Sequence, residues 1–170
     1  KKGSIYDLEL ADSNINIERK KKEAKVKSVI RTNGKLNFSQ IKKVLFLLGL
    51  STKNLKDING TVDLKTNINF DLNKKLRVKN LSYSTEGNIK HFEIDTKEKI
   101  IIKKYLPEYD PKIILKDVNI KFINSKFDHT TELSGFLKVK NYFDSFEIKE
   151  IYNYSKKSFD INGTVDLTNF

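Results

Sequence analysis

Apolar and polar residues alternate over two unusually long stretches of the chain. From position 58 to 72 the even positions are mostly apolar and the odd positions are polar. Successive side chains of a strand point to opposite faces, so this pattern predicts one long strand with a single apolar face. The stretch 24–38 alternates in the same way, with Val29 as the one exception. Both predicted strands are far longer than the usual strand of about five or six residues.

An eight-residue sequence, DINGTVDL, occurs twice, at 57–64 and at 160–167. The Asn-Gly pair inside it is typical of a two-residue hairpin turn. The alternation nevertheless continues without a break through Gly60 and through Gly163. We therefore predict that each copy lies within a strand. Its glycine then lies on the apolar face, where the strand bends or another group comes close to the backbone.

Shorter alternating segments occupy much of the remaining chain. They lie at 6–10, 15–17, 76–78, 81–83, 92–94, 118–122, 133–139 and 146–148, with turn residues at 11–14, 73–75, 124–126 and 154–157. Both prolines fall in 106–111, which we expect to be a loop because proline cannot donate to a central strand ladder. The pattern predicts an all-β fold, a meander of antiparallel strands with one apolar face.

One segment departs from this alternation. Its apolar residues recur at helical spacing, at Ile41, Val44, Leu45 and Leu48. Ser39 can cap the first turn and Gly49 can end the last one. We therefore expect one short α-helix at 39–49, packed on or across the end of the sheet.

The length of the chain favours a single β-rich unit over residues 1–170, and its composition argues against a nucleic-acid partner. The net charge is +11, from 33 Lys and Arg against 22 Asp and Glu, but only Arg19, Arg31 and Arg77 are arginines. Arginine is the residue favoured for bidentate phosphate and base contacts, so the basicity is general rather than directed to a site. The basic run 19–22 lies between two strand patterns, where a solvated hairpin tip is expected. Without cysteine there is neither a disulfide framework nor a thiolate metal site.

Candidate catalytic residues are few. His129 follows Asp128 directly, and neighbours in a strand point to opposite faces, which makes an Asp-His dyad geometrically poor. His91 is expected to be an exposed strand residue. The carboxylates are scattered along the polar faces, and the glycines match no phosphate-binding loop. We therefore expect no enzyme activity, no metal and no cofactor. An enzyme whose site is assembled from scattered Asp and Lys residues stays as a distant alternative.

Over most of residues 38–170 the chain resembles the AsmA-like envelope proteins of bacteria with two membranes. The resemblance is carried by a short helix ending in Leu-Gly-Leu, a strand with Gly-x-Val-Asp-Leu and further glycine-bearing strands. These features lie in IKKVLFLLGLSTKNLKDINGTVDLKTNINFDL, LRVKNLSYSTEGNIKHFEI and SFDINGTVDLTNF. The high lysine content departs from the family, as does the lack of its N-terminal membrane helix. That lack leads us to expect an internal or C-terminal fragment of a longer repeat protein.

The resemblance implies a long, open, curved sheet whose apolar inner surface forms a groove. Phospholipid acyl chains would pass along this groove between the inner and outer membranes. It also implies a periplasmic location, attachment to the inner membrane through flanking regions, and neighbouring repeats of the same chain as partners. The predicted lipid-contacting residues are Ile58, Val62, Leu64, Ile68, Phe70 and Leu72 around the first copy of the repeat, and Phe159, Ile161, Val165 and Leu167 around the second.

A structural or adhesive β-sandwich module is the main alternative. In such a module a second sheet covers the apolar face and forms a closed protein core. Because protein packing alone explains the same alternation, the pattern does not separate a groove from a core.

Overall fold

The computed structural model describes residues 3–5, 8–19, 23–39, 42, 55–96, 112–139, 141–166 and 168. These residues form nine strands. Their bounds are β1 Gly3–Ile5, β2 Leu8–Arg19, β3 Glu23–Asn37, β4 Leu55–Asn73, β5 Val78–Thr96, β6 Lys112–Asn124, β7 Asp128–Val139, β8 Tyr142–Asn153 and β9 Ser158–Val165.

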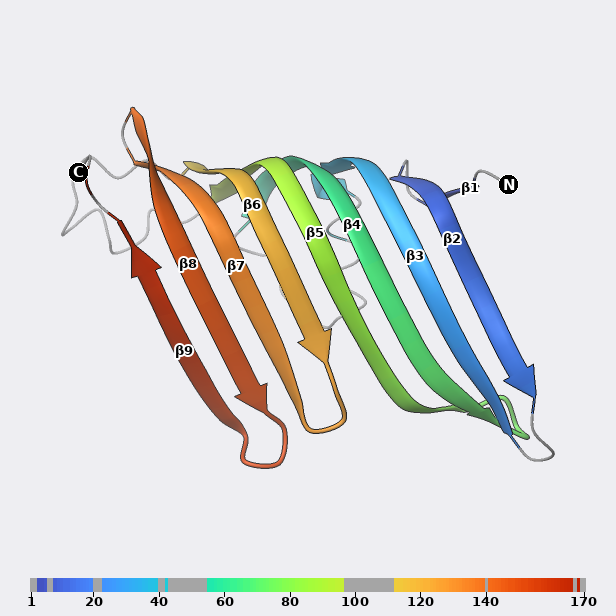
Figure 1. Cartoon of the computed structure of the whole chain (residues 1–170). Coiled ribbons are helices and arrows are strands. Elements are labelled where there is room, and N and C mark those ends of the chain that lie inside the picture. The colour runs from blue at the N-terminus through green and yellow to red at the C-terminus, as the bar shows by residue number, and fades with distance from the viewer. Residues whose placement is uncertain are drawn as a thin grey trace.

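The strands form one sheet in which spatial order follows chain order from β1 to β9 (Figure 1). Every neighbouring pair is antiparallel. The sheet is open, since no described strand joins β1 to β9. The predicted all-β antiparallel meander is thus confirmed. The two-sheet sandwich is not formed by the described strands, which make a single layer.

The two long alternating stretches are long strands, as predicted. β4 has 19 residues and β3 has 15, so the backbone of β4 extends over roughly 60 Å at about 3.3 Å per residue. The Asn59-Gly60 pair lies inside β4, and Asn162-Gly163 lies inside β9. The Asn-Gly pair is therefore a strand element in both copies of DINGTVDL.

The turn predicted at 11–14 was wrong. These residues belong to β2, which continues through them with a bulge between Ala11 and Asn14. Asp12 has a φ of 44°, and Ser13 Oγ donates to the Ala11 carbonyl while it accepts from the Arg31 amide. Residues that are typical of a turn form a bulge at this position. Asp tolerates the left-handed conformation, and the Ser hydroxyl hydrogen-bonds the backbone groups that the bulge displaces.

The short segments predicted around 78–94 are also a single strand. β5 has 19 residues and contains a register shift near Asn80. Asn80 has a φ of 51°, and its side-chain amide donates to Asp71 of β4. The shift changes which residues face each side and so interrupts the alternation in the sequence without ending the strand.

The helix predicted at 39–49 lies mostly outside the described residues. Within the described part, Phe38, Ser39 and Lys42 have helical backbone. The loop predicted at 106–111 lies entirely outside it.

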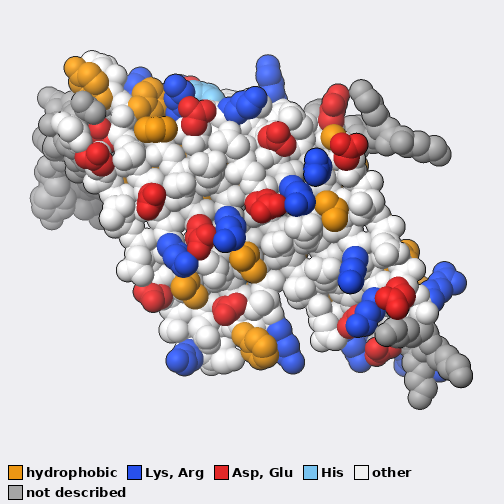
Figure 2. All heavy atoms as spheres, in the orientation of Figure 1, with side chains coloured by type: hydrophobic (Ala, Val, Ile, Leu, Met, Phe, Trp, Pro, Cys, Tyr) orange, Lys and Arg blue, Asp and Glu red, His pale blue; other side chains and the backbone are white. Residues whose placement is uncertain are grey.

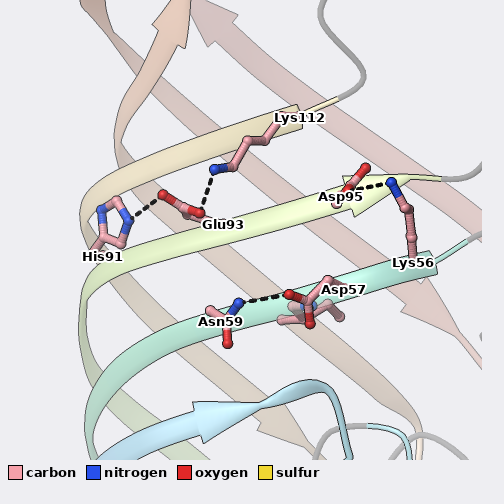
Figure 3. A network of polar contacts seen from close by, with 8 residues as sticks. Lys56, Asp57, Asn59, His91, Glu93, Asp95 and Lys112 are labelled. Atoms are coloured by element: carbon pink, nitrogen blue, oxygen red, sulfur yellow. Dashed lines mark hydrogen bonds and ion pairs between the residues drawn. The ribbon is translucent and has the colours of Figure 1, made fainter.

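The sheet is strongly curved along its strands. In Figure 1, β4 and β5 turn over at one end and continue behind the sheet, away from the viewer. The front face in that view is therefore convex and the rear face concave. Figure 3 shows the curved part of β4, β5 and β6 from close by.

Candidate functional site

The strand register separates an apolar face from a polar one. In β4, Ile68 pairs with Ser28 of β3 and with Tyr83 of β5, whereas the neighbouring Asn67 pairs with Val29 and Ser84. The side of the sheet on which Asn67 lies carries the charged side chains seen on the front, convex face (Figure 2). The side on which Ile68 lies is therefore the concave face. The concave face is our candidate site.

One row of residues at the level of the bend lies on the concave face, with its members opposite each other on adjacent strands. We call this row the bend rung. It consists of Gly34, Val62, Ile89, Val118, Gly135, Phe146 and Val165. Val62 and Val118 are each only 1% exposed, and Phe146 is 5% exposed.

Bulges and glycines mark the same level of the sheet. The register shifts between Thr61 and Val62 in the β4–β5 pair, and between Lys116 and Asn119 in the β6–β7 pair. Asp117 has a φ of 49°, so the second shift contains a left-handed residue. Bulges bend a strand, and their position beside the bend rung explains why the sheet curves there.

Close backbone approaches make glycine necessary on the inner side of the bend. A β-carbon on Gly87 would lie 2.1 Å from the Asp63 carbonyl oxygen, and Gly87 has a φ of 155°. A β-carbon on Gly135 would lie 2.8 Å from the Cα of Val118. The curved strands can come this close only where a side chain is missing.

The structure places nine of the ten predicted lipid-contacting residues on the concave face. The six on β4 are buried or half-buried, at Ile58, Val62, Leu64, Ile68, Phe70 and Leu72. The three on β9 are exposed, with 57% for Phe159, 58% for Ile161 and 46% for Val165. Leu167 lies outside the described residues. The two groups share a face but lie on strands separated by β5 to β8. Whether they contact lipid stays a prediction.

A row of aromatic rings crosses the concave face near the end away from the bend. Ring centroids of Tyr83 and Phe122 lie 5.6 Å apart, those of Phe122 and His129 5.8 Å, and those of His129 and Tyr152 5.4 Å. Phe159 continues the row on β9, at 6.0 Å from Tyr152. Such offset and edge-to-face contacts stabilise neighbouring strands.

Polar groups hold the middle of this aromatic row, at His129. Nε2 of His129 lies 3.1 Å from Glu150, and its Nδ1 lies 3.2 Å from the Tyr154 hydroxyl. Tyr154 donates to Asn124 at 2.5 Å. Burial raises the pKa of the Tyr154 phenol, and the nearby Tyr83, Asp128 and Tyr152 raise it further. The phenol therefore stays a hydrogen-bond donor at neutral pH.

The predicted absence of an Asp128-His129 dyad agrees with these contacts. The Asp128 carboxylate accepts from Ser125 Oγ at 2.6 Å, in the turn before β7. His129 instead contacts Glu150 of β8 and Tyr154, which the sequence did not indicate. Both partners lie more than twenty positions away in the chain. Across the described residues, no three His, Asp or Glu side chains are grouped so that they could hold a metal ion.

The convex face carries a ladder of alternating charges. Lys65 pairs with Glu86 at 3.0 Å, and Glu132 pairs with Lys149 at 2.8 Å and with Lys121 at 3.4 Å. Figure 2 shows acidic and basic side chains alternating across the middle of this face. The hydrogen bond from Lys149 and the positive charge of Lys121 lower the pKa of Glu132. Lysines at the centre of the convex face are therefore engaged with carboxylates of adjacent strands.

A second polar network lies beyond the bend (Figure 3). Glu93 of β5 contacts Lys112 of β6 at 2.7 Å and His91 at 3.0 Å. The hydrogen bond from Lys112, followed by that from His91, lowers the pKa of Glu93. His91 is an exposed strand residue, as predicted. These contacts join β5 to β6 where the two strands curve.

Two buried polar residues lie on the concave face: Ser28, which the alternation of 24–38 already assigned to the apolar side, and Asp144, which was not anticipated. Ser28 is 7% exposed and donates to the Asn14 carbonyl, while Asp144 is 3% exposed and lies opposite Leu137. Asp144 shares the face with the predicted pair Phe146 and Ile148, so its position could have been found from parity alone. Val118 and Phe146 were in predicted strands, but only the strand register shows that both belong to the bend rung.

No family model, no characterised protein and no solved structure matches the chain. Among the described residues, no helix is long and apolar enough to cross a membrane. A functional proposal therefore rests on the geometry of the concave face and on the sequence resemblance described above.

Proposed function

We propose that this chain is a non-enzymatic lipid-binding protein of the bacterial envelope whose concave face holds phospholipid acyl chains. The acyl chains would lie along the concave face, with the polar headgroups in solvent at its mouth. In this proposal the protein conducts phospholipid between the inner and outer membranes. The envelope and periplasmic setting, and membrane attachment through flanking regions, come with the resemblance to AsmA-like proteins.

The observation that carries the proposal is the continuity of the apolar concave face. The cross-strand register brings apolar residues of β2 through β9 onto one side of one sheet, and several of them remain exposed. The exposed ones include Ile15, Ile17, Ile148, Phe159, Ile161 and Val165. Each square ångström of apolar surface left in water costs about 25 cal/mol, so an apolar occupant of this face is favoured.

The curvature supports an extended occupant rather than a compact one. The bend rung runs across the strands from β3 to β9, so the concave face continues in the direction in which the strands follow one another. A flexible hydrocarbon chain can follow such a surface. Binding of this kind needs no catalytic group, in keeping with the scattered carboxylates and the structural contacts of His129.

A matched pair of isoleucines provides the test. Ile148 lies on the concave face at 39% exposure, and Ile123 lies on the convex face at 40% exposure. The chain would be expressed in the bacterial envelope, and phospholipid that co-purifies with it would be measured by native mass spectrometry and lipid extraction. Transfer of fluorescent phospholipid between vesicles would be measured on the same samples.

We expect Ile148→Asp to remove most of the co-purifying phospholipid and to slow transfer at least about tenfold, because a carboxylate is poorly tolerated beside acyl chains. Ile123→Asp should retain both the co-purifying phospholipid and the transfer rate of the parent chain. Both substitutions are at partly exposed positions, so the fold should persist, which circular dichroism would verify. A lipid-free parent chain, or equal activity in both variants, would exclude the lipid-binding role. Val62→Asp is not a suitable test variant: Val62 is only 1% exposed, so an aspartate in its place would disrupt folding.

A further inference from the structure

The outer edge of β9 is built differently from the other edge of the sheet. All eight residues of β9 are exposed, and its register with β8 has no irregularity. At the opposite edge the three-residue β1 covers only Leu8 to Leu10 of β2, and β2 carries a bulge at Asp12 and Ser13 just beyond it; short edge strands and bulges are ways in which proteins protect a sheet edge. No described strand pairs with the outer side of β9. An extended strand edge of this kind, with unpaired backbone groups, is a template for pairing with another strand.

The first copy of DINGTVDL, at 57–64 in β4, shows which kind of strand pairs with this sequence. In the β4–β5 pair, Ile58 lies opposite Ile94, Asn59 opposite Glu93, and Gly60 opposite Phe92. The Phe92 ring lies over Gly60, where a β-carbon would be only 2.5 Å from its Cδ2. The glycine of the repeat thus provides the space for an aromatic ring from the next strand.

The edge strand β9 contains both halves of this arrangement. Its residues 161–163, Ile-Asn-Gly, repeat residues 58–60 of β4. Its residues 159–161, Phe-Asp-Ile, match residues 92–94 of β5, which read Phe-Glu-Ile. The two halves overlap at Ile161. A strand with this sequence is complementary to itself when it runs antiparallel to a second copy.

We infer that two copies of this chain associate through β9, antiparallel, about a two-fold axis at Ile161. Ile161 then lies opposite Ile161 of the second copy, as Ile58 lies opposite Ile94. Gly163 lies opposite Phe159 of the second copy, as Gly60 lies opposite Phe92. The two sheets join into one, and because the axis is perpendicular to the sheet their concave faces lie on the same side.

The backbone geometry agrees with this register. The Asp166 amide donates to the Ser145 carbonyl of β8. Backbone groups alternate in direction along an antiparallel strand, so the amides of Ile161 and Gly163 point to the free edge. The close neighbours of Gly163 all lie on its β8 side: the nearest atoms to a β-carbon there are Glu147 O at 3.2 Å and Ile148 Cγ1 at 3.5 Å, and no aromatic ring lies over it as Phe92 lies over Gly60.

The charges favour the same register. With the axis at Ile161, Asp160 lies opposite Asn162 of the second copy, and Asp166 comes opposite Lys156 in the turn before β9 of the second copy. With the axis shifted to Gly163, Asp160 would lie opposite Asp166, and like charges directly opposite each other are destabilising. The pairing depends on the sheet edge alone and does not require lipid.

The oligomeric state provides the first test, by sedimentation velocity over a wide concentration range. We expect a dimer that Ile161→Lys weakens by more than about tenfold, because it places two like charges at the axis. The matched control is Ile17→Lys, since Ile17 has 55% exposure on the concave face at the other edge. This variant should dimerise like the parent. A monomeric parent, an Ile161→Lys variant that still dimerises, or equal loss in both variants would refute the pairing.

The register provides a second test, which the lack of cysteine in the chain makes simple. Ile161→Cys should form a disulfide-linked dimer with copper phenanthroline under air, because the two sulfurs meet at the axis. In Val165→Cys the two sulfurs would be offset by eight residues, about 26 Å, and should not link. A cross-link at Val165, or none at Ile161 in a chain that still dimerises, would overturn this register.

Discussion

The ring of Phe92 lies directly over Gly60 on the concave face, and a β-carbon at Gly60 would be 2.5 Å from its Cδ2. Both residues lie one step from the bulge between Thr61 and Val62. Where the sheet curves, the Phe92 ring therefore occupies the space that a side chain at Gly60 would need. This relationship explains why the alternation passes through a glycine without a break in the strand.

We predict that Gly60→Ala destabilises the chain by about 1–3 kcal/mol, because the added methyl group forces the Phe92 ring to move. The His91 carbonyl, 2.9 Å from the same point, limits where the group can go. Urea unfolding would measure the loss. Gly163→Ala is the matched control from the second copy and should cost less. Both would be made in chains carrying Ile161→Lys, so that association does not contribute. Equal losses at the two glycines would contradict the role of the ring.

Gly87→Ala should be the more damaging change, with a loss of more than about 3 kcal/mol or failure to fold. A β-carbon there would lie 2.1 Å from the Asp63 carbonyl oxygen, and backbone cannot move aside as a side chain can. The φ of 155° adds strain for any residue with a side chain. Thr85→Ala, two residues away on the same face, should cost only about 1 kcal/mol for the lost hydrogen bond to Thr66. Thermal unfolding of both variants would compare them.

Alternation predicted the long strands correctly because the polarity of each residue in a strand depends mainly on which face of the sheet it occupies. The long stretches in β3 and β4 were found for this reason, and so was the strand character of Asn59-Gly60. The segment at Ala11–Asn14 was misread because a bulge and a turn use the same residues. Asp12 and Ser13 satisfy local backbone groups in either case, and only the continued pairing with β3 distinguishes them.

Less of the candidate site could be predicted from the sequence, because the site depends on which strands are neighbours. The bend rung combines residues from β3 to β9, and its members Val62, Val118 and Phe146 are far apart in the chain. The contact of His129 with Glu150 depends on the β7–β8 register in the same way. Parity assigns a face to each of these residues, whereas the row in which it lies follows from turn lengths and bulges.

Glu93 should make stability depend on pH in the acidic range. Its pKa in the folded chain is lowered from the ordinary value of 4.5, first by Lys112 and then by His91. A lowered pKa means that the ionised group stabilises the fold above its unfolded pKa, and that this contribution is lost as the pH falls through the folded pKa. The effect should stay below about 1 kcal/mol because the side chain is partly exposed.

Unfolding of the Glu93→Gln variant should therefore depend less steeply on pH below 4.5 than unfolding of the parent. Lys112→Gln removes the largest cause of the lowered pKa and should flatten the same part of the curve. Urea titrations at a series of pH values would measure both. A parent curve and a Glu93→Gln curve that stay parallel through the acidic range would show that this network does not contribute.

The Tyr154 hydroxyl joins three strands beside the middle of the aromatic row, since it contacts Asn124 of β6 and His129 of β7, and Tyr154 follows β8 directly. Tyr154→Phe keeps the ring contacts with Tyr152 and His129 but leaves Asn124 and His129 without this partner. We expect a loss of about 1 kcal/mol in the free energy of unfolding. The control is Tyr142→Phe, because Tyr142 is 57% exposed at the other end of β8 and should lose almost nothing. If both variants unfold at the same urea concentration, the aromatic row is held by its rings alone.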